Sequence, residues 1–365
     1  MSSNRYGERR ARALAAAEEA DLAGLLVTPG SDFVYLTGHQ ADPYERLTLL
    51  ILAVGRDPVL VVPTLERPLA EAAPGIEGVQ IVDWRDDDDA HEVAARILRA
   101  GRYAISDQTW ASHLLELERA TADCLFVPAG RALPLLRAVK DDLEVELLRA
   151  AARAADDTFA DLVEIRFAGR REREVADAVR ERLLEHGHET AEFAIVASGP
   201  NGASPHHGAG ERTIEERDAV VLDFGGTREG YFSDITRTVF VGQPDEEQRT
   251  VYEAVRAAQQ AAFEAIRPGV PAQDVDRAAR AVISEAGYGD RFVHRTGHGI
   301  GLDLHEPPYI VEGNEIRLQA GMTFSDEPGI YLPGRFGVRI EDQVVVTPSG
   351  AERLNDATRD LRLVA

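Results

Sequence analysis

Two aspartates occupy positions where a carboxylate is costly to place. Asp223 follows four apolar residues in AVVLDFGG, and Asp234 lies among strand-forming residues in YFSDITRTVF. Because Gly225, Gly226 and Gly230 between them permit a tight reversal, the two aspartates can face each other on a hairpin. A carboxylate buried there without a partner carries a large desolvation penalty. The pair therefore needs a shared proton, an arginine or a cation.

Other side chains of the sequence help to choose between these options. Arg237 makes a structural network of aspartate and arginine a competing interpretation if the pair is taken alone. A lone histidine is more often a core or surface residue than a ligand. Only a set of several histidines and acids would indicate a metal site. Further histidines and acids do follow: His294, His298 and His305 in HRTGHGIGLDLHE, Glu327 in SDEPGIY and Glu341 in RIED.

The residue types indicate which metal ions such a set would hold. Carboxylates with an imidazole suit hard or borderline ions such as Mn²⁺, Co²⁺ or Zn²⁺. A thiolate zinc site is excluded because the chain has a single cysteine. Four carboxylates balance the charge of two divalent ions. That balance suits a hydrolytic site in which two ions, about 3.5–4 Å apart, activate one water.

The elements that must position these residues fall into two parts. In the first part, apolar segments alternate with helical patterns at 89–100 and 111–121, which predicts a layered α/β domain. The last apolar segment contains Cys124, which we expect to be buried. Six segments are predicted strands: GLLV at 24–27, TLLILAV at 48–54, PVLVV at 58–62, VQIVDW at 79–84, RYAIS at 102–106 and DCLFV at 123–127.

The second part opens with helices and then changes to strands. A long amphipathic helix begins at Asp141 behind acidic first-turn residues, and a second helix ends near Gly187. The segments EFAIVASG, AVVLDFGG and TRTVFVG follow as strands, then two helices around 245–286 and glycine-rich strands. Because helices and antiparallel strands segregate, this pattern is typical of an α+β domain.

Composition excludes several classes of partner. With 63 acidic against 40 basic residues the formal charge is −23, which argues against nucleic-acid binding. The acidic run RDDDDAHE at 85–92 is interpreted as a solvated helix start. No segment approaches the roughly 20 uncharged apolar residues of a membrane helix, and the first residues do not resemble a signal peptide. We therefore expect a cytoplasmic protein that binds neither membrane nor nucleic acid.

The ordered motifs resemble those of a known enzyme family. LDFGG with SDITRT, GHGIGLDLHE, EPGIY and RIED are similar to the motifs of the pita-bread metallopeptidases, in particular the proline-specific prolidase and aminopeptidase P branch. SDFVYLTG and LRAVKDDLEVELLR extend the match over nearly the whole chain. The resemblance implies an α/β N-terminal domain of the creatinase/prolidase type at 1–132 and an α+β pita-bread catalytic domain at 133–365.

The resemblance also implies roles for individual residues. Two divalent ions, Mn²⁺ before Co²⁺ or Zn²⁺, would be held by five ligands: Asp223 on one ion, Asp234 and Glu341 bridging both, and His298 and Glu327 completing the other. Catalytic roles fall to His206, His294, His305 and Arg339, and substrate contacts to Tyr44, Arg46, Tyr231 and Tyr331. Asp326, where the family usually has an apolar residue, is expected to point outward or to support the ligands.

The expected substrate is a Xaa-Pro peptide, and its length is the open point. A dipeptidase must recognise the free carboxylate beside proline, but Tyr309 occupies the place where some prolidases carry the arginine that does so. Arg46 with Tyr44 could supply that cation across a homodimer, so we predict a dipeptidase, with aminopeptidase P as the alternative. Retention of all five ligands disfavours a creatinase-type hydrolase or a binding module.

Overall fold

The computed structural model describes residues 4–365, which form two compact units divided between Arg137 and Ala138. The boundary expected at 132/133 lies in the same stretch, after the short helix α6 (Ala129–Ala132). Within the described residues, no helix is long and apolar enough to cross a membrane.

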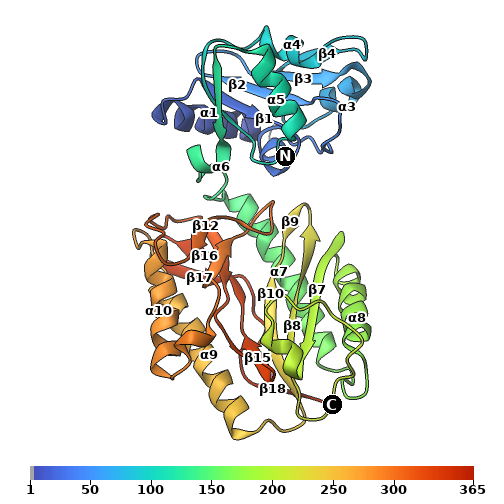
Figure 1. The fold of residues 1–365 in the computed structure, drawn as a ribbon, viewed down its shortest axis with the longest axis vertical. Coiled ribbons are helices and arrows are strands. Elements are labelled where there is room, and N and C mark those ends of the chain that lie inside the picture. The colour runs from blue at the N-terminus through green and yellow to red at the C-terminus, as the bar shows by residue number, and fades with distance from the viewer. Residues whose placement is uncertain (1–3) are drawn as a thin grey trace. The chain divides into compact units, whose positions relative to one another are not determined.

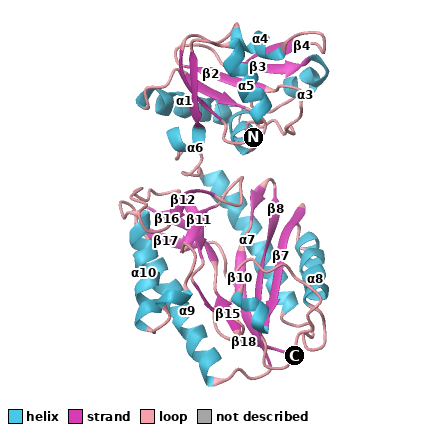
Figure 2. Cartoon of the chain, viewed as in Figure 1, coloured by secondary structure: helices cyan, strands magenta, loops and turns pink. Residues whose placement is uncertain are grey.

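The first unit contains one six-stranded mixed sheet in the order β4-β3-β2-β1-β5-β6, with helices around it (Figure 2). All six predicted strands are present: β1 (Gly24–Val27), β2 (Leu49–Ala53), β3 (Val59–Pro63), β4 (Gln80–Trp84), β5 (Gly101–Ile105) and β6 (Cys124–Pro128). The helices are α1 (Asn4–Glu19), α2 (Ser31–Thr37), α3 (Arg67–Glu71), α4 (Ala90–Ala95), α5 (Ala111–Ala120) and α6.

Local sequence explains the elements of this unit. Apolar residues of β1 to β3 are buried because they pack against residues of α4 and α5, such as Ala94 and Leu117. Asp89 accepts backbone N–H groups at the start of α4, as the acidic run predicted. Cys124 differs from expectation: it is only half-buried, because it begins β6 at the edge of the sheet.

The second unit holds helices on both sides of antiparallel strands; Figure 1 shows α9 and α10 at one side and α8 at the other. Its first half comprises α7 (Asp142–Leu162), α8 (Glu172–Glu185), β7 (Thr190–Ser198), β8 (Ala219–Arg228), β9 (Tyr231–Phe232) and β10 (Ile235–Val241). The second half comprises α9 (Glu246–Ala265), α10 (Ala272–Glu285), β11 (Gly297–Gly299), β12 (Glu306–Ile310), β13 (Thr323–Asp326), β14 (Gly329–Leu332), β15 (Phe336–Arg339), β16 (Asp342–Thr347), β17 (Gly350–Arg353) and β18 (Arg362–Val364).

The second unit repeats a helix-pair motif that the sequence did not reveal. Helices α7 and α8 have 21 and 14 residues, and α9 and α10 have 20 and 14. The first helix of each pair begins with a capping box, at Asp141 and at Asp245. A later segment bridges the residue before each second helix, Arg171 to Thr213 and Pro271 to Arg317. Each half thus presents its strands against its own helix pair.

Two larger sheets and one two-stranded sheet, β14-β15, result from this arrangement. One has the order β18-β10-β8-β7, with β9 paired to β8, and the other has the order β12-β11-β13-β16-β17. One face of the first sheet is apolar: Leu222, Phe224 and Ile235 pack with residues of α7 and α8 in a continuous core. Because strand residues alternate between faces, Asp223 and Asp234 lie on the other face.

Candidate metal centre

Strand register brings three acids together on that face. Asp223 is paired with Thr236 across β8 and β10, and Thr236 is bridged in turn to Glu341. Asp234 lies two residues before Thr236 and therefore on the same face. Gly225 permits this close packing, because a Cβ there would lie 2.0 Å from the Ser233 carbonyl oxygen. The predicted hairpin between the aspartates is confirmed, with Glu341 added beside it.

The remaining two predicted ligands come from β11 and the end of β13. His298 Nδ1 donates to the Gly299 carbonyl oxygen at 3.1 Å, so its Nε2 carries a lone pair. That Nε2 lies 3.5 Å from Asp234 Oδ2 and 3.4 Å from Glu327 Oε1. Ser325 positions both residues: its Oγ accepts the His298 N–H at 3.0 Å and donates to Glu327 Oε1 at 3.2 Å. A histidine fixed in this tautomer is typical of metal ligation.

The donor set fits divalent cations. Ligand atoms of Asp234, His298 and Glu341 all lie within 4.8 Å of one another. Among the described residues, the buried oxygens Asp223 Oδ1 and Glu341 Oε1 have no hydrogen-bond partner. Buried acceptors left unpaired in this way carry a large penalty unless a cation or proton faces them. The residues present therefore suit the ions that the sequence predicted.

Burial and mutual repulsion disturb the titration of these acids. Burial raises the pKa of Asp234 well above its usual value, and the charge of Asp223 raises it further. Burial and the charge of Asp234 raise the pKa of Glu341 in the same way. Burial raises the pKa of Glu327 to about 7. Without bound cations, the folded protein thus prefers these groups protonated.

The metal-free protein should consequently lose stability as the pH rises from 5 to 8. A raised folded-state pKa stabilises the fold fully below the unfolded value of 4.5 and no longer does so above about 7. At about 1.4 kcal/mol per pKa unit, Glu327 alone contributes about 3 kcal/mol, or a melting temperature lower by roughly 10 °C. Thermal melts of chelated and metal-loaded protein at both pH values measure this.

Two controls accompany these melts. The metal-loaded protein should show a much smaller pH dependence, because bound cations hold the carboxylates ionised at both pH values. Chelated Glu327→Gln should lose part of the dependence, since it lacks one of the titrating groups. Equal melting temperatures of the chelated wild type at pH 5 and pH 8 would contradict the description of the cluster.

Arg339 organises one wall of the site. Its guanidinium donates to Asp223 Oδ2 at 2.5 Å and to the Tyr331 hydroxyl at 2.7 Å. The Tyr331 hydroxyl in turn lies 2.8 Å from His294 Nε2, while His294 Nδ1 donates to the Arg295 carbonyl oxygen. Burial and the charge of Arg339 lower the pKa of His294 to about 3, so this imidazole is neutral and accepts the Tyr331 proton. A continuous chain of hydrogen bonds thus runs from Asp223 through Arg339 and Tyr331 to His294.

Arg237, the competitor considered above, does not pair with either aspartate. It is fully buried on the opposite face of β10, where its guanidinium donates to Asp342 Oδ1 at 2.6 Å. Asp326 corrects a second expectation. It points away from Glu327 as predicted, but it is completely buried beside Asp342 and not directed outward. The reason is that α9 covers this face of the second sheet, where Gln259 bonds Asp342.

One cavity of about 500 Å³ joins these groups. All five predicted metal ligands line it, together with the predicted catalytic residues His206, His294, His305 and Arg339. Its other walls are Phe193, Ile195, Pro205, Leu304 and Arg295. Arg295 was missed, although it directly follows His294 in the motif HRTGHG. Ser325 and Thr236 were missed because their roles depend on cross-strand pairing.

The predicted substrate-contacting residues are distributed differently. Tyr331 belongs to the hydrogen-bonded chain of side chains from Asp223 to His294 and is not among the residues that line this cavity. Tyr231 is buried, donates to Glu144 at 2.9 Å and is not among the residues that line this cavity. Tyr44 and Arg46 line a small pocket of the first unit, together with Trp110 and His113.

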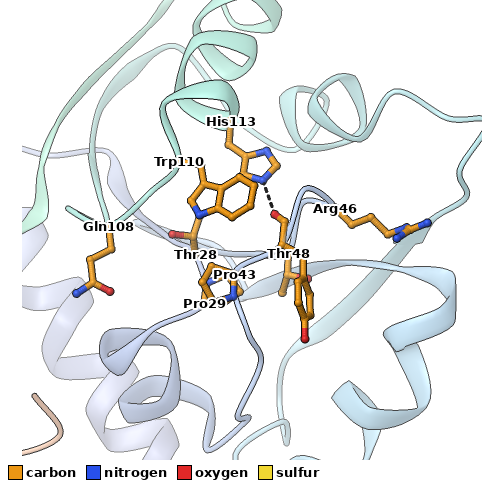
Figure 3. A pocket seen from close by; sticks show the side chains of 9 residues that line it. Thr28, Pro29, Pro43, Arg46, Thr48, Gln108, Trp110 and His113 are labelled. Atoms are coloured by element: carbon orange, nitrogen blue, oxygen red, sulfur yellow. Dashed lines mark hydrogen bonds between the residues drawn. The ribbon is translucent and has the colours of Figure 1, made fainter. Parts of the chain in front are cut away.

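In that pocket of the first unit, Arg46 is already engaged. Its guanidinium points away from Trp110 and His113 (Figure 3) and contacts Asp86 at 3.0 Å and Glu45 at 2.9 Å. Tyr44 is exposed and bonds Asp42. Exposed ion pairs of this kind contribute little free energy, so Arg46 can leave them at small cost.

The fold and the carboxylate and imidazole cluster together define a metallopeptidase. More specifically, the chain belongs to metallopeptidase family M24, whose model matches residues 146–348, and residues 9–139 match the creatinase/prolidase N-terminal domain. The family and the two-domain fold expected from the motifs are thereby confirmed.

Individual relatives cover almost the whole chain. It is 47% identical over 363 residues to the probable dipeptidase PepE of Mycobacterium tuberculosis, covering 98% of this chain and 96% of the relative. It is 36% identical over 342 residues to the Xaa-Pro dipeptidase of Lactobacillus helveticus, covering 90% and 92%. The crystal structure of dipeptidase PepE from Mycobacterium ulcerans matches with a TM-score of 0.95 at 46% identity, over 100% of this chain and 99% of that one.

Proposed function

We propose that the chain is a Xaa-Pro dipeptidase that hydrolyses the imide bond before proline with two divalent metal ions. The observation that carries this is the convergence of four acids and one oriented imidazole on a single cavity of about 500 Å³. A cavity of this size accommodates a small ligand such as a dipeptide. The relatives named dipeptidase and Xaa-Pro dipeptidase support the substrate class.

The free atoms of each acid suggest how the ions would be held. Asp223 would offer Oδ1 to one ion, since Arg339 occupies its Oδ2. Glu341 would offer Oε1, since the Thr236 hydroxyl donates to its Oε2 at 2.6 Å. Asp234 and Glu341 would be shared by both ions, and His298 with Glu327 would complete the second ion. When bound, the ions polarise the scissile carbonyl and activate water.

The histidines that line the cavity would act on the substrate itself. His206 and His305 are exposed side chains of the cavity wall and can donate to the carbonyl oxygen as charge develops on it. His294 cannot serve as a free base, because Tyr331 and the Arg295 carbonyl occupy both of its ring nitrogens. We assign it, with Arg339, to the positioning of Asp223 and of the pocket wall.

Apolar side chains explain how an imide can be accepted. A bond before proline has no N–H, so a site for it must recognise shape in place of that donor. Phe193 and Ile195 are two residues apart on β7, so their side chains lie on the same face and line the cavity. Leu304 lines it as well. We assign these three to the proline ring and the side chain before it.

Several finer features belong to the same proposal. Mn²⁺ as the ion, a homodimer and a cytoplasmic location remain predictions from the family resemblance. The same holds for Tyr44 and Arg46 as substrate contacts donated by a second subunit. Their exposure and weak ion pairs are compatible with that role.

A substrate panel tests the proposed function. Chelated protein is reloaded with Mn²⁺, Co²⁺ or Zn²⁺ and assayed with Xaa-Pro dipeptides, Xaa-Pro-Yaa tripeptides and Xaa-Ala dipeptides. We expect metal-dependent cleavage of the Xaa-Pro dipeptides above the other two classes. Tripeptides cleaved equally well or better would indicate an aminopeptidase, and inactivity toward all Xaa-Pro substrates with every ion would reject both functions.

A further inference from the structure

Two arginines line the cavity, and one of them has no donor to spare. The Arg339 guanidinium donates to Asp223, Tyr331 and Thr236, and Nη2 also lies 3.4 Å from the Pro205 carbonyl oxygen. Turning Arg339 toward a ligand would leave these buried partners unpaired, which is costly. Arg339 therefore holds the site together and is not available to an incoming anion.

Arg295 is the opposite case. It lines the cavity and is half-buried, yet within residues 4–365 its guanidinium makes neither a hydrogen bond nor an ion pair with a carboxylate. It lines the same cavity as His298, His305 and the acids predicted to bind metal. A cation placed so near groups that would bind divalent ions is unfavourable unless a further anion joins it.

Tyr309 determines the position of the Arg295 guanidinium. The Arg295 guanidinium lies 4.5 Å from the centroid of the Tyr309 ring, a cation–π contact. Tyr309 is paired with His298 across β11 and β12, so its ring shares the face of the sheet that carries His298. The contact therefore holds the guanidinium on the side of the cavity formed by His298 and His305, and none of the described residues accepts a hydrogen bond from it.

The substrate proposed above brings a matching anion. In a dipeptide the free carboxylate is three bonds from the scissile carbonyl carbon, which is a distance of about 3–4 Å. The cation that binds it must therefore line the same cavity as the reacting groups. Arg295 meets this condition, forms no ion pair with a carboxylate of residues 4–365, and presents the planar donors that suit a carboxylate.

We propose that Arg295, oriented by Tyr309, binds the free carboxylate of the dipeptide and makes the site select dipeptides over longer or amidated peptides. This inference rests on the proposed function and specifies its substrate. It also gives a role to Tyr309, which occupies the place where some prolidases carry an arginine: its ring holds the guanidinium of Arg295.

The test compares a Xaa-Pro dipeptide with its C-terminal amide, which differs only in the carboxylate. For Arg295→Gln, we expect KM for Ala-Pro to rise about 10–100-fold, as for the loss of a charge-assisted pair, with kcat nearly unchanged. KM for Ala-Pro-amide should hardly change. Arg295→Lys should keep part of the preference, because it retains the charge without the fork of donors.

Matched variants separate recognition from support of the fold. Arg291→Gln, at an exposed arginine outside the cavity, should behave like wild type. Arg295→Gln combined with Tyr309→Arg returns a cation to the same wall and should restore part of the preference for Ala-Pro.

Three outcomes would overturn the inference or its basis, and they can be told apart. If Arg295→Gln raised KM equally for Ala-Pro and its amide, Arg295 would only support the structure of the cavity wall. An unchanged ratio in Arg295→Gln, with the ratio lost in Arg46→Ala, would move the carboxylate site to Arg46. Failure of the wild type to cleave either substrate would reject the proposed function itself, and the role of Arg295 with it.

Discussion

Replacing Glu341 by alanine should abolish turnover and leave a folded protein. Glu341 is buried, its Oε1 is unpaired among the described residues, and the charge of Asp234 acts on it directly. Its loss would remove the acid that we assign to both ions and leave three carboxylates for two divalent cations. We expect activity on Xaa-Pro dipeptides to fall to background and bound metal to fall by about half or more.

The fold should survive this change for a structural reason. The cores of the second unit lie between strands and helices on the far faces of its sheets, and Glu341 is not part of them. Circular dichroism and a cooperative melt would verify this. Glu315→Ala, at an exposed acid outside the cavity, is the matched control and should retain full activity and metal. Near wild-type turnover in Glu341→Ala would refute the assignment of the site.

His206→Ala should lower the rate without removing metal. The His206 side chain lines the cavity and is exposed, and none of the described residues forms a hydrogen bond with its ring. Its closeness to the other imidazoles is evident because, after burial, it contributes to lowering the pKa of both His294 and His305. A group so placed can donate to the developing oxyanion, and its loss costs about 10²–10⁴-fold in kcat.

Metal content distinguishes this role from ligation. His206→Ala should bind as much metal as wild type, whereas His298→Ala should bind less, because Nε2 of His298 faces the acids. His186→Ala serves as a control, since that ring pairs with Asp161 at the surface. Loss of metal in His206→Ala would show that this residue is a ligand. An unchanged rate would show that it is a surface residue without a role in catalysis.

Much of the site follows from strand alternation and could be predicted. The apolar surroundings of Asp223 and Asp234 and the glycines between them predict one hairpin, and the register confirms it. The same alternation argues against Arg237 as their partner, because Arg237 directly follows Thr236, whose side chain shares the face of the aspartates. The partner is Arg339, which comes from a strand more than a hundred residues later.

Other features depend on contacts that alternation does not specify. Asp326 was placed on the correct face, but whether that face is open or covered depends on the docking of α9. The contact between Arg295 and Tyr309 depends on the pairing of β11 with β12, which sets His298 opposite Tyr309. The repeated helix pair escaped detection because it is preserved in helix lengths, caps and bridges and not in residue identities.

A repeated helix pair would ordinarily suggest that the two halves of the second unit unfold independently. The last strand argues otherwise, because β18 pairs in parallel with β10 of the first half. The Ala365 carbonyl also accepts the N–H groups of Phe167 and Ala168, which follow α7. The C-terminal segment therefore completes the sheet of the first half, and we expect one cooperative unfolding transition, with the slowest-exchanging amides of β8 and β16 protected by the same free energy.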